Sequence, residues 1–146
     1  MEFMDSCVFC EIIRGKVEAS VVFEDADCAA FMDIQPVNSG HMLVVPKIHA
    51  ACLSDLDEGV GAQLFKVAMR LDKALRKSGL RCEGVNLFLA DGEAAFQEIF
   101  HVHLHVIPRF IGDGFGLKFG PHYYERPTRS SLDEVAGKIR SKISTD

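Results

Sequence analysis

Three histidines alternate with apolar residues in the segment HVHLHV at positions 101–106. Successive side chains of a strand point to opposite faces, so His101, His103 and His105 would share one face at a spacing of about 6.6 Å, with the apolar residues packed behind them. With six histidines in 146 residues, chance placement of two more at these positions has a probability of roughly 0.002. Histidine can act as a nucleophile, a proton carrier or a metal ligand near neutral pH. The segment therefore predicts a functional site in preference to an ordinary half-exposed strand.

A second chemical pattern lies at the start of the chain, where Cys7 and Cys10 form a Cys-x-x-Cys pair. This spacing allows two thiolates to bind one tetrahedral metal ion. A redox pair and two buried thiols are the alternatives, although the sequence lacks the βαβ context of a thioredoxin-like redox motif. The odd total of five cysteines argues against a disulfide framework, and Cys28, Cys52 and Cys82 are interpreted as packed side chains.

Composition and length predict one globular domain over residues 1–146. The chain is 48% hydrophobic and 25% charged, and its net charge of −5 argues against general binding to nucleic acid or to an anionic membrane. A small nucleotide remains compatible with that charge. The first six residues lack the basic and apolar regions of a secretory signal, and no segment has the length of a membrane span, so we expect a cytoplasmic protein.

Hydrophobic patterns and turn residues predict five strands. These are expected over residues 21–24, 28–32, 41–45, 84–90 and 99–107. The first two form a hairpin, and the third is bracketed by turns, as expected of a central strand. The last carries the alternating histidines and is expected to end at Pro108. The order of the strands is typical of an antiparallel meander.

Two helices are expected to accompany the strands. A long amphipathic helix is predicted over residues 57–78, and a C-terminal helix over 130–146 begins near Ser131, which has capping-box spacing to Glu134. Residues 112–129 are rich in glycine, proline and aromatic side chains and are interpreted as a surface loop. Together these elements predict an α+β fold with helices on one face of the sheet.

The order of several motifs closely resembles that of the histidine triad family of nucleotide hydrolases and transferases. The resembling segments are CVFCEIIRG from Cys7, FMDIQP with Gly40-His41 and VPKIH in the middle, and QEIFHVHLHVIPR from Gln97 to Arg109. The resemblance implies the family fold and cleavage at the α-phosphate of a purine nucleoside phosphoramidate or dinucleoside polyphosphate. It also implies a nucleotidyl-histidine intermediate.

Matched positions imply roles for the residues around the triad. His103 resembles the nucleophile, and a backbone carbonyl is expected to hold the other nitrogen of its ring. His105 and Gln97 are expected to contact phosphate oxygens and to stabilise the charge that develops on them. His101 is expected to support its neighbour from the end of the row. His41 and His122 receive no chemical role and are expected at surface or hydrogen-bonded positions.

The resemblance also implies a nucleoside pocket. Asp33 matches the acid that accepts hydrogen bonds from ribose hydroxyls, and Val8, Phe9 and Ile12 match the apolar wall against the base. Core packing is the alternative for Phe9 and Ile12. For Asp33 the alternative is formation of a turn before the Gln-Pro dipeptide that follows.

Bacterial relatives of this type use the cysteine pair together with two histidines as a zinc site. The matching residues here are Cys7, Cys10, His49 and His101. Four protein ligands would complete the coordination of Zn²⁺, so the resemblance implies a structural ion that braces the N-terminal loop against the histidine strand. It also implies a homodimer, with the long helix and the fourth strand at the interface.

Two positions depart from the family pattern. Ala90 stands where many relatives have asparagine near the phosphates, and Phe96 stands where they have glycine. These departures keep open the alternative of a nucleotide-binding module with little turnover. A third hypothesis is that the triad binds a catalytic metal that activates water, which requires an open coordination position on that metal.

Overall fold

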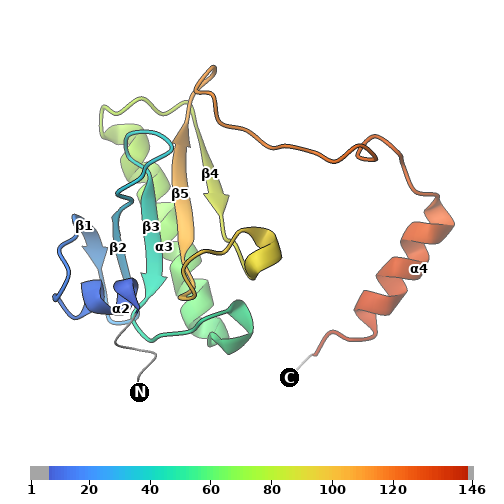
Figure 1. Ribbon diagram of the computed structural model, residues 1–146, viewed down its shortest axis with the longest axis horizontal. Coiled ribbons are helices and arrows are strands. Elements are labelled where there is room, and N and C mark those ends of the chain that lie inside the picture. Colours follow the sequence, from blue (N-terminus) through green and yellow to red (C-terminus); the bar gives the residue numbers. More distant parts are fainter. Residues whose placement is uncertain (1–6, 145–146) are drawn as a thin grey trace. The chain divides into compact units, whose positions relative to one another are not determined.

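The computed structural model describes residues 7–144 of the chain (Figure 1). Residues 1–6, on which the expectation about a secretory signal falls, lie outside this range, as do residues 145–146 of the expected C-terminal helix. The chain divides after Phe115 into two compact units, the first with the sheet and the second with the C-terminal helix. Within the described range, no helix combines the length and the apolar character needed to cross a membrane.

Within residues 7–144, five strands form one antiparallel sheet in the order β1-β2-β3-β5-β4 (Figure 1). They are β1 (Val21–Glu24), β2 (Cys28–Met32), β3 (Met42–Pro46), β4 (Gly84–Phe88) and β5 (Leu104–Arg109). The first three strands form a meander. The chain then crosses through a long helix to β4 at the edge, and β5 returns between β4 and β3. The predicted α+β fold with a five-stranded antiparallel sheet is confirmed.

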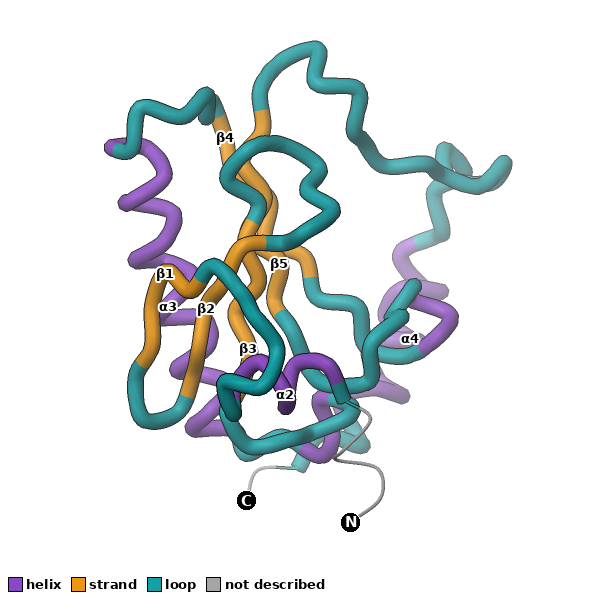
Figure 2. The backbone as a smooth tube through the Cα atoms, turned by 60° about the vertical axis from the view of Figure 1, so that its left-hand side comes forward, coloured by secondary structure: helices purple, strands orange, loops and turns teal. Residues whose placement is uncertain are grey.

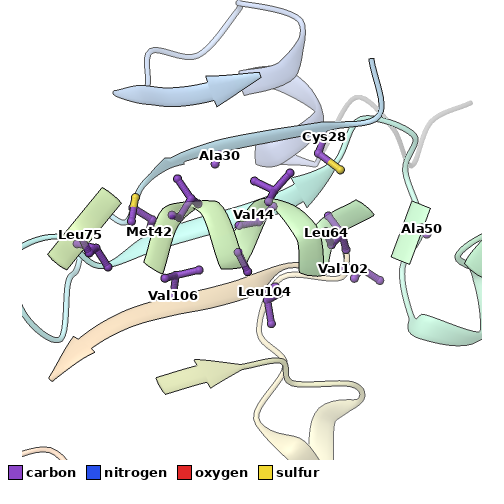
Figure 3. Packing of buried hydrophobic residues seen from close by; sticks show 13 residues of the cluster. Cys28, Ala30, Met42, Val44, Ala50, Leu64, Leu75, Val102, Leu104 and Val106 are labelled. Carbon is purple, nitrogen blue, oxygen red and sulfur yellow. The ribbon is translucent and has the colours of Figure 1, made fainter. Parts of the chain in front are cut away.

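The long helix α3 (Glu58–Lys77) covers one face of the sheet and packs against β2, β3 and β5. Its start agrees with the prediction, because the Asp57 side chain accepts a hydrogen bond of 3.2 Å from the Val60 N–H and caps the helix. The buried cluster between helix and sheet includes Leu64, Leu75, Val44, Leu104 and Val106 (Figure 3). This core supports the strand that carries the histidines.

The opposite face of the sheet is covered in part by a short helix, α2 (Val8–Ile13), which lies beside the end of β3 (Figure 2). Phe9 and Cys10 are buried there against Phe31 and Leu43. The expectation of an N-terminal loop is therefore wrong. The Cys7 sulfur accepts a hydrogen bond from the Cys10 N–H at the start of the helix, and burial of one apolar side stabilises a helix too short to persist alone.

The histidine strand begins later than predicted. Ladder pairing of β5 with β3 runs from Leu104 to Val106, so His101 and His103 precede the strand in an irregular segment. The strand also continues through Pro108 to its end at Arg109. Pro108 lies beyond the residues of β5 that pair with β3, so it has a strand partner only on the β4 side. A proline can occupy such a position because its missing N–H leaves no gap in a second ladder.

The second unit contains α4 (Arg129–Arg140). Thr128 caps this helix by accepting a hydrogen bond of 3.1 Å from the Ser131 N–H. The helix begins near Ser131, as predicted, but its cap is Thr128 and not Ser131. Residues 116–128 contain no regular helix or strand, as expected for a loop.

Candidate functional site

The three alternating histidines lie on the α2 side of the sheet, but they belong to two neighbouring arrangements. His105 pairs with Leu43 in the ladder, while Val102, Leu104 and Val106 of the same segment join the core under α3. The predicted alternation is confirmed although only His105 is in the strand. His101 is fully buried beside two cysteines, whereas His103 and His105 line a cavity with their ring centres 5.0 Å apart.

The first arrangement brings together the four predicted metal ligands. The ligand atoms of Cys7, Cys10, His49 and His101 all lie within 4.8 Å of one another. Cys10 Sγ is 3.3 Å from His49 Nδ1 and 3.5 Å from His101 Nδ1. Cys7 Sγ is 3.4 Å from His101 Nδ1, and the two imidazole nitrogens are 3.2 Å apart. Helix α2 places both sulfurs on one side, and the segments after β3 and before β5 supply the histidines.

These separations can be compared with the edges of a tetrahedral zinc site. Bonds of about 2.0 Å to nitrogen and about 2.3 Å to sulfur at the tetrahedral angle separate two nitrogens by about 3.3 Å. The same bonds separate nitrogen from sulfur by about 3.5 Å. The nitrogen pair at 3.2 Å and the mixed pairs at 3.3 to 3.5 Å agree within a few tenths of an ångström. The four side chains therefore fit a closed tetrahedral site.

The protonation of His101 also suits a ligand. Its Nε2 lies 2.8 Å from the Pro46 carbonyl oxygen, which can only accept, so Nε2 carries the hydrogen and Nδ1 faces the cluster unprotonated. Burial lowers the pKa of His101 to about 4 and keeps the ring neutral at pH 7. Burial, followed by the neighbouring Cys7, raises the pKa of Cys10 to about 11. Without a metal, the raised pKa keeps Cys10 in its protonated thiol form at pH 7. A bound metal cation would displace the thiol protons and favour the thiolate.

The second arrangement contains His103, whose ring is buried among cavity-lining residues. Its Nδ1 lies 2.8 Å from the carbonyl oxygen of His101. Because the carbonyl only accepts, Nδ1 donates the hydrogen, and in the neutral ring Nε2 keeps its lone pair. The expected backbone acceptor is thus the carbonyl of the preceding histidine. Phe9 of α2 contacts the same ring edge-on, with centroids 5.1 Å apart, and helps fix its orientation.

The tautomer of His105 is opposite to that of His103, and His41 is the reason. The Val37 N–H donates to His41 Nδ1 at 3.0 Å, so neutral His41 carries its hydrogen on Nε2. That hydrogen is donated to His105 Nδ1 at 2.9 Å, which leaves the hydrogen of His105 on Nε2. Burial lowers the pKa of both rings, and with the neighbouring histidines it lowers that of His105 to about 4, so both are neutral at pH 7.

The site therefore places a nucleophilic lone pair beside a hydrogen-bond donor. His103 offers an unprotonated nitrogen, and His105 offers an N–H, in rings that line the same cavity. The sequence analysis missed His41, which sets the tautomer of His105 from a buried position just before β3. Its expected hydrogen bonding is confirmed. The signal that could have identified it is a Gly-His pair immediately before an apolar central strand.

Asp33 forms a turn and also lines the cavity. Its Oδ1 accepts a hydrogen bond of 2.8 Å from the Gln35 N–H, which forms the turn considered as the alternative. Its Oδ2 lies 3.5 Å from His41 Nε2 and 4.0 Å from His105 Nδ1, at the cavity wall. Asp33, His41 and His105 could geometrically surround an ion, but the hydrogen bond between the two rings already accounts for their closeness.

The cavity itself has a volume of about 500 Å³, which is within the usual range for a small-molecule site. Six of the seven residues predicted to contact a nucleotide line it: Val8, Phe9, Ile12, Asp33, His103 and His105. Further apolar lining comes from Phe31, Leu43, Ile34, Phe96 and Ile99. An apolar wall joined to a few polar groups is the composition expected of a site for a flat base with a polar attachment.

Gln97, the seventh predicted contact, is not among the cavity-lining residues. Its Oε1 accepts from the Gly92 N–H at 2.8 Å, and its Nε2 donates to the Ala51 carbonyl at 2.7 Å and to the Ile99 carbonyl at 3.2 Å. The buried amide thus joins the loop before the histidines to the segment after β3. Its observed contacts are with the protein backbone.

The fold and the site define an α+β protein with a row of histidines shared between a nucleotide-sized cavity and a Cys/His cluster. Comparison with known families matches residues 14–112 to the HIT domain. A crystal structure of a HIT family protein from Bacillus anthracis superposes with a TM-score of 0.87 at 37% identity, covering 96% of this chain and 99% of that one. A Zn-bound histidine triad family protein from Mycobacterium smegmatis gives 0.74 at 36% identity, covering 96% and 99%.

Among the sequence relatives is an adenosine 5'-monophosphoramidase of Candida albicans. It is 35% identical over 144 residues, which make up 97% of this chain and 91% of the relative. The chain belongs to the HIT, or histidine triad, family.

Proposed function

We propose that the protein is a nucleotide hydrolase or transferase that cleaves at the α-phosphate of a purine nucleoside phosphoramidate or dinucleoside polyphosphate. The observation that carries the proposal is the pair of hydrogen bonds that engage Nδ1 of His103 and Nδ1 of His105, which leave a lone pair on Nε2 of neutral His103 and an N–H on Nε2 of His105 in one cavity. The similarity to an adenosine 5'-monophosphoramidase supports the same substrate class.

The first step is a displacement at phosphorus. His103 Nε2 forms a bond to the α-phosphorus, and the bond from phosphorus to the leaving nitrogen or oxygen breaks. The leaving atom keeps the electron pair and takes up a proton from solvent. The His103 ring becomes cationic and keeps its hydrogen on Nδ1, where the His101 carbonyl stabilises the charge. The His105 N–H donates to a phosphate oxygen as negative charge develops there.

The second step regenerates the histidine. Water attacks the phosphorus of the nucleotidyl group, loses a proton, and displaces His103 Nε2, which recovers its lone pair. The products are a nucleoside monophosphate and neutral His103. An alcohol or phosphate acceptor in place of water would make the reaction a transfer. Division of one displacement into two is the usual advantage of a covalent intermediate.

The nucleoside portion is assigned to the remaining cavity residues. Asp33 Oδ2 is proposed to accept from ribose hydroxyls, and Val8, Phe9 and Ile12 are proposed to cover the purine. For Gln97, the backbone contacts favour a role in holding the loop beside the phosphates. Direct contact between Gln97 and a phosphate oxygen stays a prediction.

Zinc is proposed as a structural ion held by Cys7, Cys10, His49 and His101. The near-tetrahedral separations and the unprotonated Nδ1 of His101 support this assignment. The ion would cross-link α2 to the segment leading into the histidines, and four protein ligands leave no open position for water. Catalysis through a metal at the triad is not favoured, because Nδ1 of His101 faces the two cysteines and His49, whereas His103 and His105 line the cavity, so the three rings do not face a common ion.

A homodimer and a cytoplasmic location stay predictions from the sequence. Support for the dimer comes from β4, which lies at the edge of the sheet and exposes Leu87 and Phe88. The neighbouring helix α3 exposes Phe65 and Met69. An unpaired edge with adjacent apolar side chains is suited to pairing with a second copy. Sedimentation showing only a 16.1 kDa species at micromolar concentration would argue against it.

Turnover of an adenosine phosphoramidate by the wild type and by His103→Ala tests the proposed function. We expect the substitution to abolish turnover while adenosine monophosphate affinity stays within about tenfold, because the lost interaction acts in the transition state. Tight nucleotide binding without wild-type turnover would instead indicate a binding module. Loss of activity on chelation while the fold survives would indicate a catalytic metal.

A further inference from the structure

Phe96 combines an unusual backbone with an unusual exposure. Within residues 7–144 it is the one non-glycine residue with a positive φ, at 70°, and it follows the short 3₁₀ helix η2 (Glu93–Ala95) in the left-handed region. A bulky side chain rarely adopts this conformation. The side chain is 82% exposed, yet it lines the cavity that contains His103 and His105.

Neighbouring hydrogen bonds impose the left-handed conformation. The Phe96 N–H donates to the Glu93 carbonyl at 2.9 Å, and the Gln97 N–H donates to the Gly92 carbonyl at 3.1 Å. The buried Gln97 side chain then links Gly92 to the Ala51 carbonyl. Glycine would satisfy this backbone without strain. The largely exposed ring of Phe96 gains little packing in the free protein that could offset the strain.

Strained residues that the surrounding structure holds in place often act on a ligand. We propose that Phe96 is a specificity-determining residue that packs against a flat aromatic ring in the leaving group of the substrate. This inference rests on the proposed function and specifies its substrate class: phosphoramidates of amines that carry an aromatic ring, or dinucleotides whose second base supplies the ring.

The position of Phe96 favours the leaving group over the nucleoside base. The wall assigned to the base contains Phe9, whose ring packs against that of Phe31; the two residues are 4% and 2% exposed and lie within the core. Phe96 presents its ring toward solvent at the cavity lining. A leaving group must depart on the side of phosphorus opposite the attacking His103 and reach solvent, so an exposed ring can cover it until the bond breaks.

The test compares two adenosine phosphoramidates that differ in the leaving amine, 2-phenylethylamine and 2-cyclohexylethylamine. Diadenosine tetraphosphate gives a third arm with a nucleobase as the ring. The measured quantity is the ratio of kcat/KM for the aromatic substrate to that for the cyclohexyl substrate. We expect Phe96→Gly and Phe96→Leu to lower this ratio about three- to tenfold, the range of a specific aromatic pair, and Phe96→Tyr to preserve it. Tyr124→Leu is the matched control, because Tyr124 is an equally exposed aromatic residue that does not line the cavity.

Thermal unfolding separates this role from a structural one. Phe96→Gly relieves the left-handed strain, so we expect its unfolding midpoint to stay within about 2 °C of the wild type or to rise, while the substrate ratio falls. If Phe96→Gly and Phe96→Leu leave the ratio unchanged while turnover through His103 persists, the inference about Phe96 is overturned and the proposed function is not. A lower midpoint with equal losses on both amines would also overturn it in favour of a structural ring. Absence of wild-type turnover on all three substrates would overturn the proposed function as well.

Discussion

Replacing His41 with leucine keeps a side chain of similar size but removes two hydrogen bonds. The half-buried Val37 N–H loses its acceptor, and His105 Nδ1 loses the donor that fixes its tautomer. The unpaired N–H should lower the free energy of unfolding by about 1 to 3 kcal/mol. His105 can then place its hydrogen on Nδ1, toward Asp33 Oδ2 at 4.0 Å, and present a lone pair to the phosphate.

The effect on catalysis follows from the energy that holds the tautomer. A hydrogen bond inside this cluster contributes about 1 to 2 kcal/mol, and 1.36 kcal/mol corresponds to a tenfold change. We therefore expect His41→Leu to lower kcat about 5- to 30-fold on an adenosine phosphoramidate, with a smaller change in KM. His41→Gln retains an amide donor that can reach His105, and it should recover much of the lost rate.

Steady-state kinetics and ¹⁵N NMR of the His105 ring provide the two readouts. In the wild type the hydrogen of His105 should be found on Nε2, and in His41→Leu it should be shared with Nδ1. A folded His41→Leu protein with kcat within twofold of the wild type would refute the reasoning. So would a His105 tautomer that does not respond to either substitution at His41.

Three further predictions concern the metal, the pH response and the nucleoside. Cys10→Ser should lower the zinc content from about one ion per chain to near zero by mass spectrometry, and the half-buried Cys52→Ser is the control; a zinc-free wild type grown with zinc would contradict this. The pKa of His105 should appear near 4 in an NMR titration, because burial lowers it from 6.5. Below pH 6.5 the unfolded chain then binds a proton that the folded chain does not, so His105 should reduce stability by up to about 1.4 kcal/mol per pH unit down to pH 4; a midpoint near 6.5 would be inconsistent. Asp33→Asn should raise KM for a ribonucleotide substrate about tenfold but should add little for a 2',3'-dideoxy substrate; equal effects on both would exclude a ribose contact.

Local sequence signals predicted much of the fold. Helix α3 lies within one residue of its predicted range, because apolar spacing and the Asp57 cap are encoded in neighbouring residues. The hairpin of β1 and β2 agrees with its predicted bounds for the same reason. The start of β5 was wrong because it depends on where β3 can pair with it, and the register of two distant segments has no local signal.

The short helix α2 was missed for a related reason. Six residues cannot form a stable helix alone, so its existence depends on burial of Phe9 and Cys10 against the sheet. The cap is a cysteine sulfur, which is outside the usual set of capping residues. Sequence spacing alone could therefore relate the two cysteines to a metal but not to a helix.

In the candidate site, too, some contacts could be predicted from the sequence and others could not. The resemblance placed Cys7, Cys10, His49 and His101 together, and the structure brings their ligand atoms into one cluster. The contact between His41 and His105 joins residues 64 positions apart through the pairing of β3 with β5, so the sequence could not reveal it. The backbone contacts of Gln97 likewise depend on where the chain after β3 passes the loop before the histidines.

The proposed reaction requires that Nε2 of His103 becomes bonded to the nucleotide. Rapid acid-free quenching of the protein with a radiolabelled adenosine phosphoramidate, followed by peptide mass spectrometry at neutral to alkaline pH, tests it most directly. We expect one adenylyl group on His103 that is absent in His103→Ala and present in the control Tyr124→Leu. Turnover by the wild type with no adduct on His103, or with the adduct on another residue, would contradict it.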